Sequence, residues 1–217
     1  MTRALGMLLG AVFAAALLPS LTPSARAETV IETSSVVNGY PKQLTFKVTA
    51  RSDSEITDVS LAYAITGRGS SAIGKPANPP SGKSMSTEVV LQVNSGASYI
   101  PVGSEFVYHW EITSADGQTV SGPDQTFFFL PPNQDWKSVK GEFMTVYYHG
   151  DKESLASSYL KAGVETYDKI GKALFGVTLK QVPVKVILFD NEKESDSARP
   201  GAGTGTFDAA VTTCGTK

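Results

Sequence analysis

The sequence predicts a mainly β protein, in which an immunoglobulin-like antiparallel β-sandwich precedes an incomplete α/β unit. Two observations lead to this fold class. From Thr29 to Leu130, apolar and polar residues alternate with a period of two, which is typical of half-buried strands. After Pro131-Pro132 the pattern changes to strand, helix and strand, the order that builds an α/β layer. We therefore expect a sandwich domain over residues 28–131, a short stiff linker over 132–134 and the truncated start of a second domain over 135–217.

The first 27 residues have the three parts of a secretory signal peptide. Arg3 supplies a positive charge, residues 5–18 are apolar, and Ala25-Arg26-Ala27 forms a small-x-small cleavage site. The expected product begins at Glu28, is secreted or extracytoplasmic, and keeps no stable membrane anchor. An uncleaved anchor is the alternative, although the apolar run is short for a bilayer span.

Charge and composition favour a folded protein that does not bind nucleic acid. The chain has 19 Lys and Arg residues against 21 Asp and Glu residues, with no basic stripe to neutralise phosphates. Hydrophobic residues make up 41% of the chain, which is enough for a core. Cys214 is the only cysteine, which excludes an internal disulfide. It is either a buried free thiol or half of a pair whose partner lies elsewhere.

The sandwich region contains several segments in which every second residue is apolar. The expected inward-facing sets begin at Leu44, Val59, Val89 and Phe106 and continue at every second residue. Asn38-Gly39 and Asp116-Gly117 are pairs that tolerate positive φ, so they predict tight hairpin turns. About six or seven strands in roughly a hundred residues, without helical periodicity, are typical of an immunoglobulin-like sandwich.

Two features of the sandwich look like ligand sites but lack the spacing that such sites need. Residues 68–83 are rich in Gly, Ser and Pro and predict a mobile loop. Within it, Gly82-Lys83-Ser84 lacks the earlier glycine of a phosphate-binding loop, because Ala77 stands there. His109 is expected on an outward face, and no second ligand lies at metal-binding spacing. We therefore expect no nucleotide or metal site in this half.

Residues 135–189 predict a strand, a helix and a second strand. Residues 142–148 are strand-like, and residues 184–189 form an apolar run that predicts an inner strand covered on both faces. Between them, residues 151–175 predict an amphipathic helix with Asp151 as N-cap and Gly176 just beyond its end. Its expected apolar stripe consists of Leu155, Tyr159, Leu160, Gly163, Tyr167, Ile170 and Leu174.

The last part of the sequence has an acidic cluster and a glycine-rich loop. Glu192, Glu194 and Asp196 match no metal-loop spacing, so a solvated helical turn is expected. The loop of residues 200–205 leads into another extended segment, residues 206–213, instead of the helix that a pyrophosphate site needs. The sequence therefore predicts a loop before an edge strand and no dinucleotide site.

Two segments at the boundary resemble a known family. SYIPVGSEFVYHWEITSADGQTVSGPDQTFFF and NQDWKSVKGEFMTVYYHGD resemble the junction in exported bacterial proteins of the peptidase MA-like family. These are gluzincin-type zinc metallopeptidases in which a β-sandwich precedes the catalytic domain. The resemblance runs from Thr29 to Lys217 and is clearest between Tyr99 and Asp151. It implies that residues 142–189 form the first part of a peptidase domain and that residues 203–213 form strands before the metal-binding helix.

The sequence departs from this family at the metal site. Gluzincins bind zinc through His-Glu-x-x-His on one helix, where the two His side chains share a face and the Glu polarises the bound water. This chain has only two histidines, His109 and His149, and neither is followed by Glu. No catalytic, cofactor-binding or metal-binding residue is therefore assigned. The resemblance implies zinc, and a protein or peptide substrate, for a full-length parent only.

Three hypotheses about function remain. In the first, the chain is the N-terminal part of an exported zinc metallopeptidase-like protein and is inactive alone. In the second, it is a complete, non-enzymatic extracellular binding module that contacts a partner through loops such as residues 68–83. The first predicts a protease-resistant core ending near Pro132, and the second predicts full protection. An inactive peptidase-fold relative is a third possibility, and it requires a downstream domain without the motif.

Overall fold

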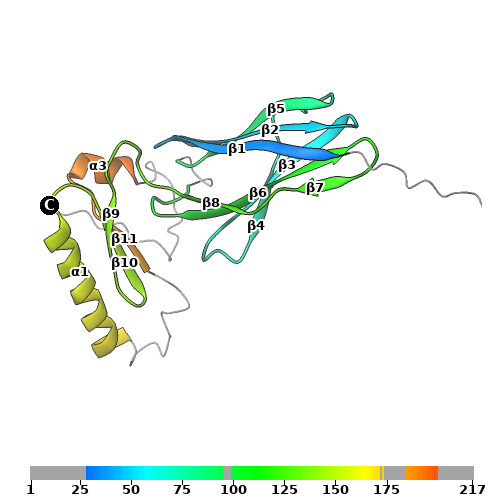
Figure 1. Ribbon diagram of the computed structural model, residues 1–217. Coiled ribbons are helices and arrows are strands. Elements are labelled where there is room, and N and C mark those ends of the chain that lie inside the picture. The colour runs from blue at the N-terminus through cyan, green and yellow to red at the C-terminus, as the bar shows by residue number, and fades with distance from the viewer. Residues whose placement is uncertain (1–27, 95–98, 172, 174–183, 200–217) are drawn as a thin grey trace, which may run out of the picture.

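Two antiparallel sheets face each other in residues 29–128 of the computed structural model, and a smaller mixed sheet with a helix lies at one end of them (Figure 1). The structure describes residues 28–94, 99–171, 173 and 184–199. The expected signal peptide, the glycine-rich loop with its following strand, Gly176 and Cys214 lie outside the described residues. Those expectations stay predictions.

The sandwich strands form two sheets of unequal size. The first has the order β1-β2-β5 and contains β1 (Thr29–Gly39), β2 (Gln43–Ser52) and β5 (Ser84–Gln92). The second has the order β4-β3-β6-β7, with β8 also paired to β6. Its strands are β3 (Ile56–Ile65), β4 (Ser71–Gly74), β6 (Glu105–Ser114), β7 (Thr119–Ser121) and β8 (Gln125–Phe128). The prediction of a mainly β protein with antiparallel sheets is confirmed.

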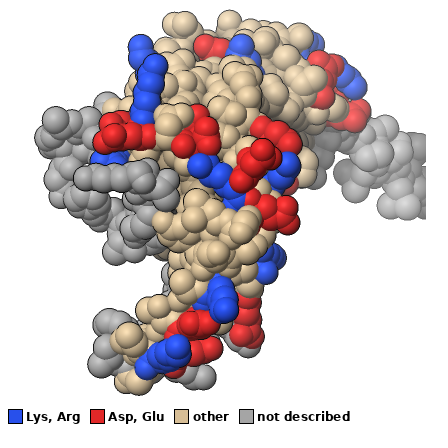
Figure 2. Space-filling model, turned by 90° about the vertical axis from the view of Figure 1, so that its left-hand side faces the viewer, with Lys and Arg blue, Asp and Glu red and all other residues tan. Residues whose placement is uncertain are grey.

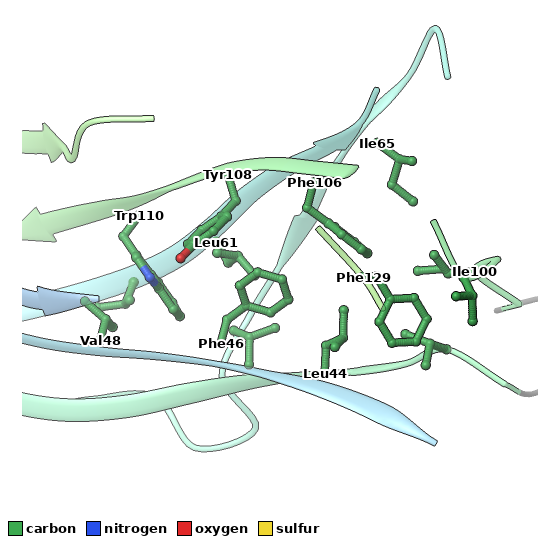
Figure 3. Close-up of a cluster of buried hydrophobic side chains, with 14 of the residues drawn as sticks. Leu44, Phe46, Val48, Leu61, Ile65, Ile100, Phe106, Tyr108, Trp110 and Phe129 are labelled. Carbon is green, nitrogen blue, oxygen red and sulfur yellow. The ribbon is translucent and has the colours of Figure 1, made fainter. Parts of the chain in front are cut away.

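The core between the two sheets is built from the inward faces that the alternation predicts. Trp110, Phe46 and Phe106 are among its largest fully buried side chains. Figure 3 shows β2 and β6 contributing their aromatic and aliphatic side chains to the same space. The Phe46 ring meets the Tyr108 ring edge-on, with 4.9 Å between the centroids. Burial of each large apolar side chain contributes about 1.5–3 kcal/mol, so the paired inner faces of β2 and β6 stabilise the sandwich.

Of the two predicted hairpin turns, one is confirmed and one is wrong. Gly117 has a φ of 80° and donates its N–H to the Ser114 carbonyl at 2.9 Å, as the Asp-Gly pair predicts. Gly39 instead ends β1 without a positive φ, and the turn follows at residues 40–42. Asn38 has another role: its side-chain amide donates to the Leu130 carbonyl at 2.7 Å. A local turn pattern cannot predict this hydrogen bond, because the two residues are 92 positions apart in the chain.

The loop expected over residues 68–83 contains an edge strand. β4 pairs with β3, and Ala72 lies opposite Tyr63 in the register. At the end of β4, a Cβ on Gly74 would lie only 2.7 Å from Cγ1 of Val89 in the other sheet, so a larger residue there would force Val89 to move. The loop prediction is wrong for Ser71–Gly74, because this four-residue segment between Gly and Pro has a single large apolar residue, Ile73, and so shows no alternation.

The second unit is a three-stranded sheet with the order β11-β10-β9, crossed by a helix. Its elements are β9 (Lys137–Lys140), β10 (Met144–Tyr148), α1 (Glu153–Thr166), the π-helical turn η2 (Tyr167–Gly171), β11 (Val184–Ile187) and α3 (Glu192–Ser197). β10 and β11 are parallel, and α1 lies between them in the chain. The strands expected over 142–148 and 184–189 are present, whereas the alternation does not predict the polar strand β9. Within the described residues β11 ends the sheet, so its inner position stays a prediction.

Helix α1 differs from the expected helix in its cap and in the phase of its buried face. Lys152, not Asp151, is the N-cap and makes no side-chain capping bond; its Nζ lies 3.2 Å from Asp190 Oδ1. Ala156 is fully buried, while Leu155 is 36% exposed and Ile170 is 52% exposed. The π-helical turn shifts the phase after Tyr167, which takes Ile170 off the apolar face. The other stripe positions that the structure describes pack against the sheet, as expected for Tyr159, Leu160 and Tyr167.

The second unit packs directly against the end of the sandwich. Ile187, Phe189 and Ala198 belong to the same buried cluster as the sandwich core. Two polar contacts reinforce this packing. Lys185 Nζ lies 2.9 Å from Glu105 Oε2, and the Tyr99 hydroxyl donates to the Ala198 carbonyl at 2.8 Å. The segment of residues 132–134 therefore connects two units that share a core, and the domain boundary drawn there stays a prediction.

Candidate functional site

His109 lies on the outer face of β6, as the alternation predicts. Its Nδ1 is 2.8 Å from Asp124 Oδ1, and its Nε2 is 3.7 Å from Glu111 Oε1. The two carboxylates approach opposite nitrogens of one ring, so the three groups do not converge on a single point. Across the described ranges, no group of three or more His, Cys, Asp or Glu side chains is placed to hold a metal ion.

His149 lies at the junction between the two units and is only 6% exposed. Its Nε2 lies 3.0 Å from Glu194 Oε2, and its ring meets Trp136 edge-on, with 4.8 Å between the centroids. The Glu194 carboxylate also accepts the Asp190 backbone N–H at 3.0 Å. The expected acidic helical turn is present as α3. Glu194, however, is tied to His149 and is not a purely solvated group.

The pair of His149 and Glu194 has one half of an acid–base site. A carboxylate that holds a histidine in one orientation is a common feature of catalytic triads, which also need a nucleophile in contact with the ring. Ser195 follows Glu194 in the chain, but its hydroxyl is buried and lies 3.4 Å from Arg199 Nη2. In the described part of the chain, the pair therefore fastens α3 to the end of β10 and has no partner for nucleophilic chemistry.

Two tyrosines connect this junction to the sandwich. Tyr40 packs on Phe129, with 6.0 Å between the ring centroids, and its buried hydroxyl has no hydrogen-bond partner among the described residues. Burial, followed by the nearby Tyr99 and Glu194, raises the pKa of Tyr40 to about 12. Burial likewise raises the pKa of Tyr99. Both phenols are therefore neutral near pH 7 and act as packing groups, with Tyr99 also donating a hydrogen bond.

A lateral pocket of about 450 Å³ opens where the two sheets separate. The sheets meet at Gly74 and Val89, and the pocket lies beyond this contact, between the end of β3 with β4 and the end of β5. It is lined by Tyr63, Ala64, Ile65, Arg68, Ser70, Ala72, Val90, Leu91, Gln92, Tyr99 and Ile100. Its volume falls within the roughly 300–1,000 Å³ that is usual for ligand sites.

The lining of the lateral pocket combines an apolar base with polar groups. Leu91 and Ile100 pack against the sandwich core, and Tyr63 belongs to the same inward face as its neighbours in β3. Arg68 brings a positive charge, and no Asp or Glu is among the lining residues. The sequence contains no motif for this site, because its residues come from segments on both sheets.

Charge elsewhere on the surface is mixed. Figure 2 shows one face of the molecule, on which Lys and Arg side chains alternate with Asp and Glu side chains. The exposed pairs include Lys47 with Glu88, whose charged atoms lie 3.7 Å apart. The expectation that the chain does not bind nucleic acid stays a prediction.

The described residues do not fit the zinc site that the family resemblance implies. The chain's two histidines are on different elements: His109 pairs with Asp124 in the sandwich, and His149 pairs with Glu194 at the junction. A gluzincin site requires two histidines one helical turn apart on the same helix. No catalytic step is therefore assigned to a metal held by these residues.

Comparison with known proteins adds little. No protein-family model and no curated protein matches the chain. Among solved structures, the chain is similar to one titled "Crystal structure of Br derivative BhCBM56", with 12% sequence identity and a TM-score of 0.31. The similarity covers 44% of this chain and 89% of that chain, and a TM-score this low carries no argument. None of the helices that the structure describes has the length and apolar character needed to span a bilayer.

Proposed function

We propose that the chain provides the accessory, immunoglobulin-like sandwich and the first β-α-β unit of an exported zinc metallopeptidase-like protein. The observation that carries this proposal is the parallel pairing of β10 with β11 around α1, directly after the sandwich. That order agrees with the start of a peptidase domain implied by the resemblance between Tyr99 and Asp151. The metal-binding helix and its zinc belong to a part of the protein beyond these residues.

The contacts at the junction support a structural role for the sandwich. Phe128 of β8 packs on Tyr147 of β10, with 4.7 Å between the ring centroids. The ammonium group of Lys185 lies 5.0 Å from the centroid of the Phe128 ring and forms its ion pair with Glu105. A sandwich held in this way fixes the first strands of the second unit and does not act as a freely tethered module.

The gene itself gives the test of this proposal. Translation of the DNA beyond the Lys217 codon is expected to continue in frame and to encode His-Glu-x-x-His on a predicted helix. Residues 1–217 alone are expected to show no peptidase activity, since they lack that motif. A stop codon directly after Lys217, with no such motif in frame, would contradict the proposal.

The lateral pocket favours a second candidate function, an extracellular binding module. The pocket belongs almost entirely to the sandwich and is large enough for a ligand. Limited proteolysis no longer separates the two candidates, because Ile187, Phe189 and Ala198 share the sandwich core. Protection from proteolysis as far as residue 199 is compatible with both candidate functions. The reading frame downstream of Lys217 therefore distinguishes them.

A further inference from the structure

We propose that Asp53 binds the α-ammonium group that forms at Glu28 when the signal peptide is removed, so that maturation adds an ion pair at the start of β1. The ligand of this site is a primary ammonium group that the chain itself supplies. The inference goes beyond the proposed function, because it concerns the sandwich alone. It rests on the cleavage predicted between Ala27 and Glu28, which the last experiment below tests separately.

Glu28 and Asp53 are joined by two hydrogen bonds. The Glu28 backbone N–H donates to Asp53 Oδ2 at 3.1 Å. In the other direction, the Asp53 N–H donates to the Glu28 carbonyl at 3.1 Å. These bonds connect the residue before β1 to the residue after β2, at the end of the sandwich away from the second unit (Figure 1). The Glu28 nitrogen is therefore held beside a carboxylate.

A cluster of three buried hydroxyl groups fixes this geometry. Thr29 follows Glu28 in the chain, and its Oγ1 lies 2.8 Å from Ser52 Oγ and 2.8 Å from Ser114 Oγ. Ser52 precedes Asp53, and its Oγ lies 3.3 Å from Ser114 Oγ. All three hydroxyl residues are buried. Because the cluster anchors the neighbours of Glu28 and Asp53, little conformational freedom is left to lose when the two residues pair.

Hydrolysis of the bond between Ala27 and Glu28 changes the chemistry of the nitrogen that faces Asp53. One water molecule is consumed, Ala27 leaves with a carboxylate, and the Glu28 amide nitrogen becomes a primary amine. An α-amino group ordinarily has a pKa of about 7.7–8.0, so it takes up a proton near pH 7. Both partners of the contact are then ionised, which adds Coulombic attraction to the hydrogen bond. Glu28 and Asp53 are exposed, so we expect the modest stabilisation of a surface ion pair.

Other charged side chains occur on the segments around this nitrogen. Arg51 of β2 pairs with Glu32 of β1, with 3.4 Å between Nε and Oε1. Lys83 and Glu55 contact this end of the sandwich through their backbone carbonyls, which accept the N–H groups of neighbouring segments. The remaining charged residues nearby are Asp116, which accepts the Gln118 N–H in the turn after β6, and Glu28 itself. Glu55 is exposed and lies two residues beyond Asp53, so it provides a matched control for the charge of that residue.

The first experiment compares two chains that differ only at the N-terminus. One begins at Glu28, and the other keeps Ala25-Arg26-Ala27 in front of it, which leaves a neutral amide at the Glu28 nitrogen. At about pH 6.5 and low salt, we expect the chain that begins at Glu28 to melt about 1–3 °C higher, as a surface ion pair predicts for a protein of this size.

Two substitutions assign that difference in melting temperature. Asp53→Asn should abolish it, because the ammonium group loses its charged partner. Glu55→Gln removes an acidic charge close by and should leave at least about half of it, since screening by salt and water weakens exposed charges that are not in contact. Equal melting of the two wild-type chains, or a difference that persists in Asp53→Asn, would overturn the proposal.

Titration of the α-amino group by NMR gives a second, local measurement. Pairing with Asp53 should raise the pKa of the Glu28 α-amino group by about half a unit or more relative to the Asp53→Asn variant. The stabilisation is therefore fully present below about pH 7.5 and is lost as the pH rises through the raised pKa. Identical titration of the amine in the two folded proteins would contradict the pairing.

N-terminal sequencing of the exported natural product tests the predicted cleavage. We expect the product to begin at Glu28. A product that begins at another residue overturns this proposal, because its charge is then carried by a nitrogen that does not face Asp53. Such a result leaves the proposed peptidase relationship unaffected, since that relationship depends on the reading frame after Lys217.

Discussion

At the scale of single residues, the sequence predicts burial better than it predicts roles. The inward set of β6 follows from alternation alone, and Trp110 and Ile112 are buried accordingly. The contact between His149 and Glu194 joins residues 45 positions apart, so no local pattern contains it. Gly103 is a similar case, because its importance comes from its backbone conformation and from a neighbour in β11.

Gly103→Ala should destabilise the protein. Gly103 has a φ of +89°, and a Cβ placed there would lie 3.0 Å from Cδ1 of Ile187. A side chain in this region of backbone space costs about 1–3 kcal/mol. We expect a loss of that size in the free energy of unfolding, measured by urea denaturation. Gly69→Ala is the matched control, since Gly69 has no positive φ and no atom within 4 Å of its added Cβ. Equal effects of the two substitutions would show that the strain is absent.

Tyr40 should make the protein less stable in strong alkali. Burial raises its pKa from 10.0 to about 12 in the folded protein. Below pH 10 both states keep the proton and the full stability is present. Between pH 10 and about 12 the unfolded chain releases its proton first, so the free energy of unfolding falls as pH rises. Tyr40→Phe should make that fall shallower in urea titrations at pH 9 to 12, without loss at pH 7, because the hydroxyl has no hydrogen-bond partner among the residues that the structure describes. An unchanged slope would contradict the assignment.

At the scale of elements, long periodic segments were predictable and short or irregular ones were not. β2, β3, β5 and β6 each show several alternations, whereas β4 and β9 have four residues each and few apolar positions. Helix α1 was recognised from its period, but the π-helical turn η2 changes the phase after it. The exact buried face of α1 therefore depends on packing against the sheet, which local spacing does not determine.

A pair of neighbouring substitutions tests the phase of α1. Ala156 is fully buried against the second cluster, and Leu155 is 36% exposed. Ala156→Glu should cost about 2 kcal/mol or more, because it buries a charged group without a partner. Leu155→Glu should change the free energy of unfolding by about 0.5 kcal/mol or less. Denaturant titration of both variants provides the comparison. A larger effect at Leu155 would support the phase expected from the sequence stripe instead.

At the scale of the whole molecule, the packing between the two units could not be predicted from sequence patterns. The Pro131-Pro132 segment predicts a spacer between separate domains, yet Ile187 and Phe189 enter the core cluster of the sandwich. The contacts involved join residues up to 99 positions apart, as between Tyr99 and Ala198. Such pairs depend on how β11 and α3 are placed by the rest of the fold.

Removing the second unit should therefore weaken the sandwich. A variant ending at Gln134 loses Ile187, Phe189 and Ala198 from the shared core. The lost burial of two large apolar side chains is expected to lower the free energy of unfolding by about 3 kcal/mol or more. Calorimetry of this variant beside one ending at Arg199 measures the difference. Equal melting temperatures would instead support a sandwich that folds independently, with a protease-resistant core ending near Pro132.

We propose that these residues are the first part of an exported zinc peptidase-like protein. The most direct measurement is the zinc-to-protein ratio of the natural product, captured from the culture medium with an antibody against the sandwich. We expect a product that begins at Glu28, is heavier than the 23.0 kDa of this chain and carries one zinc per molecule. A secreted product with the mass of residues 28–217 and without bound zinc would contradict it.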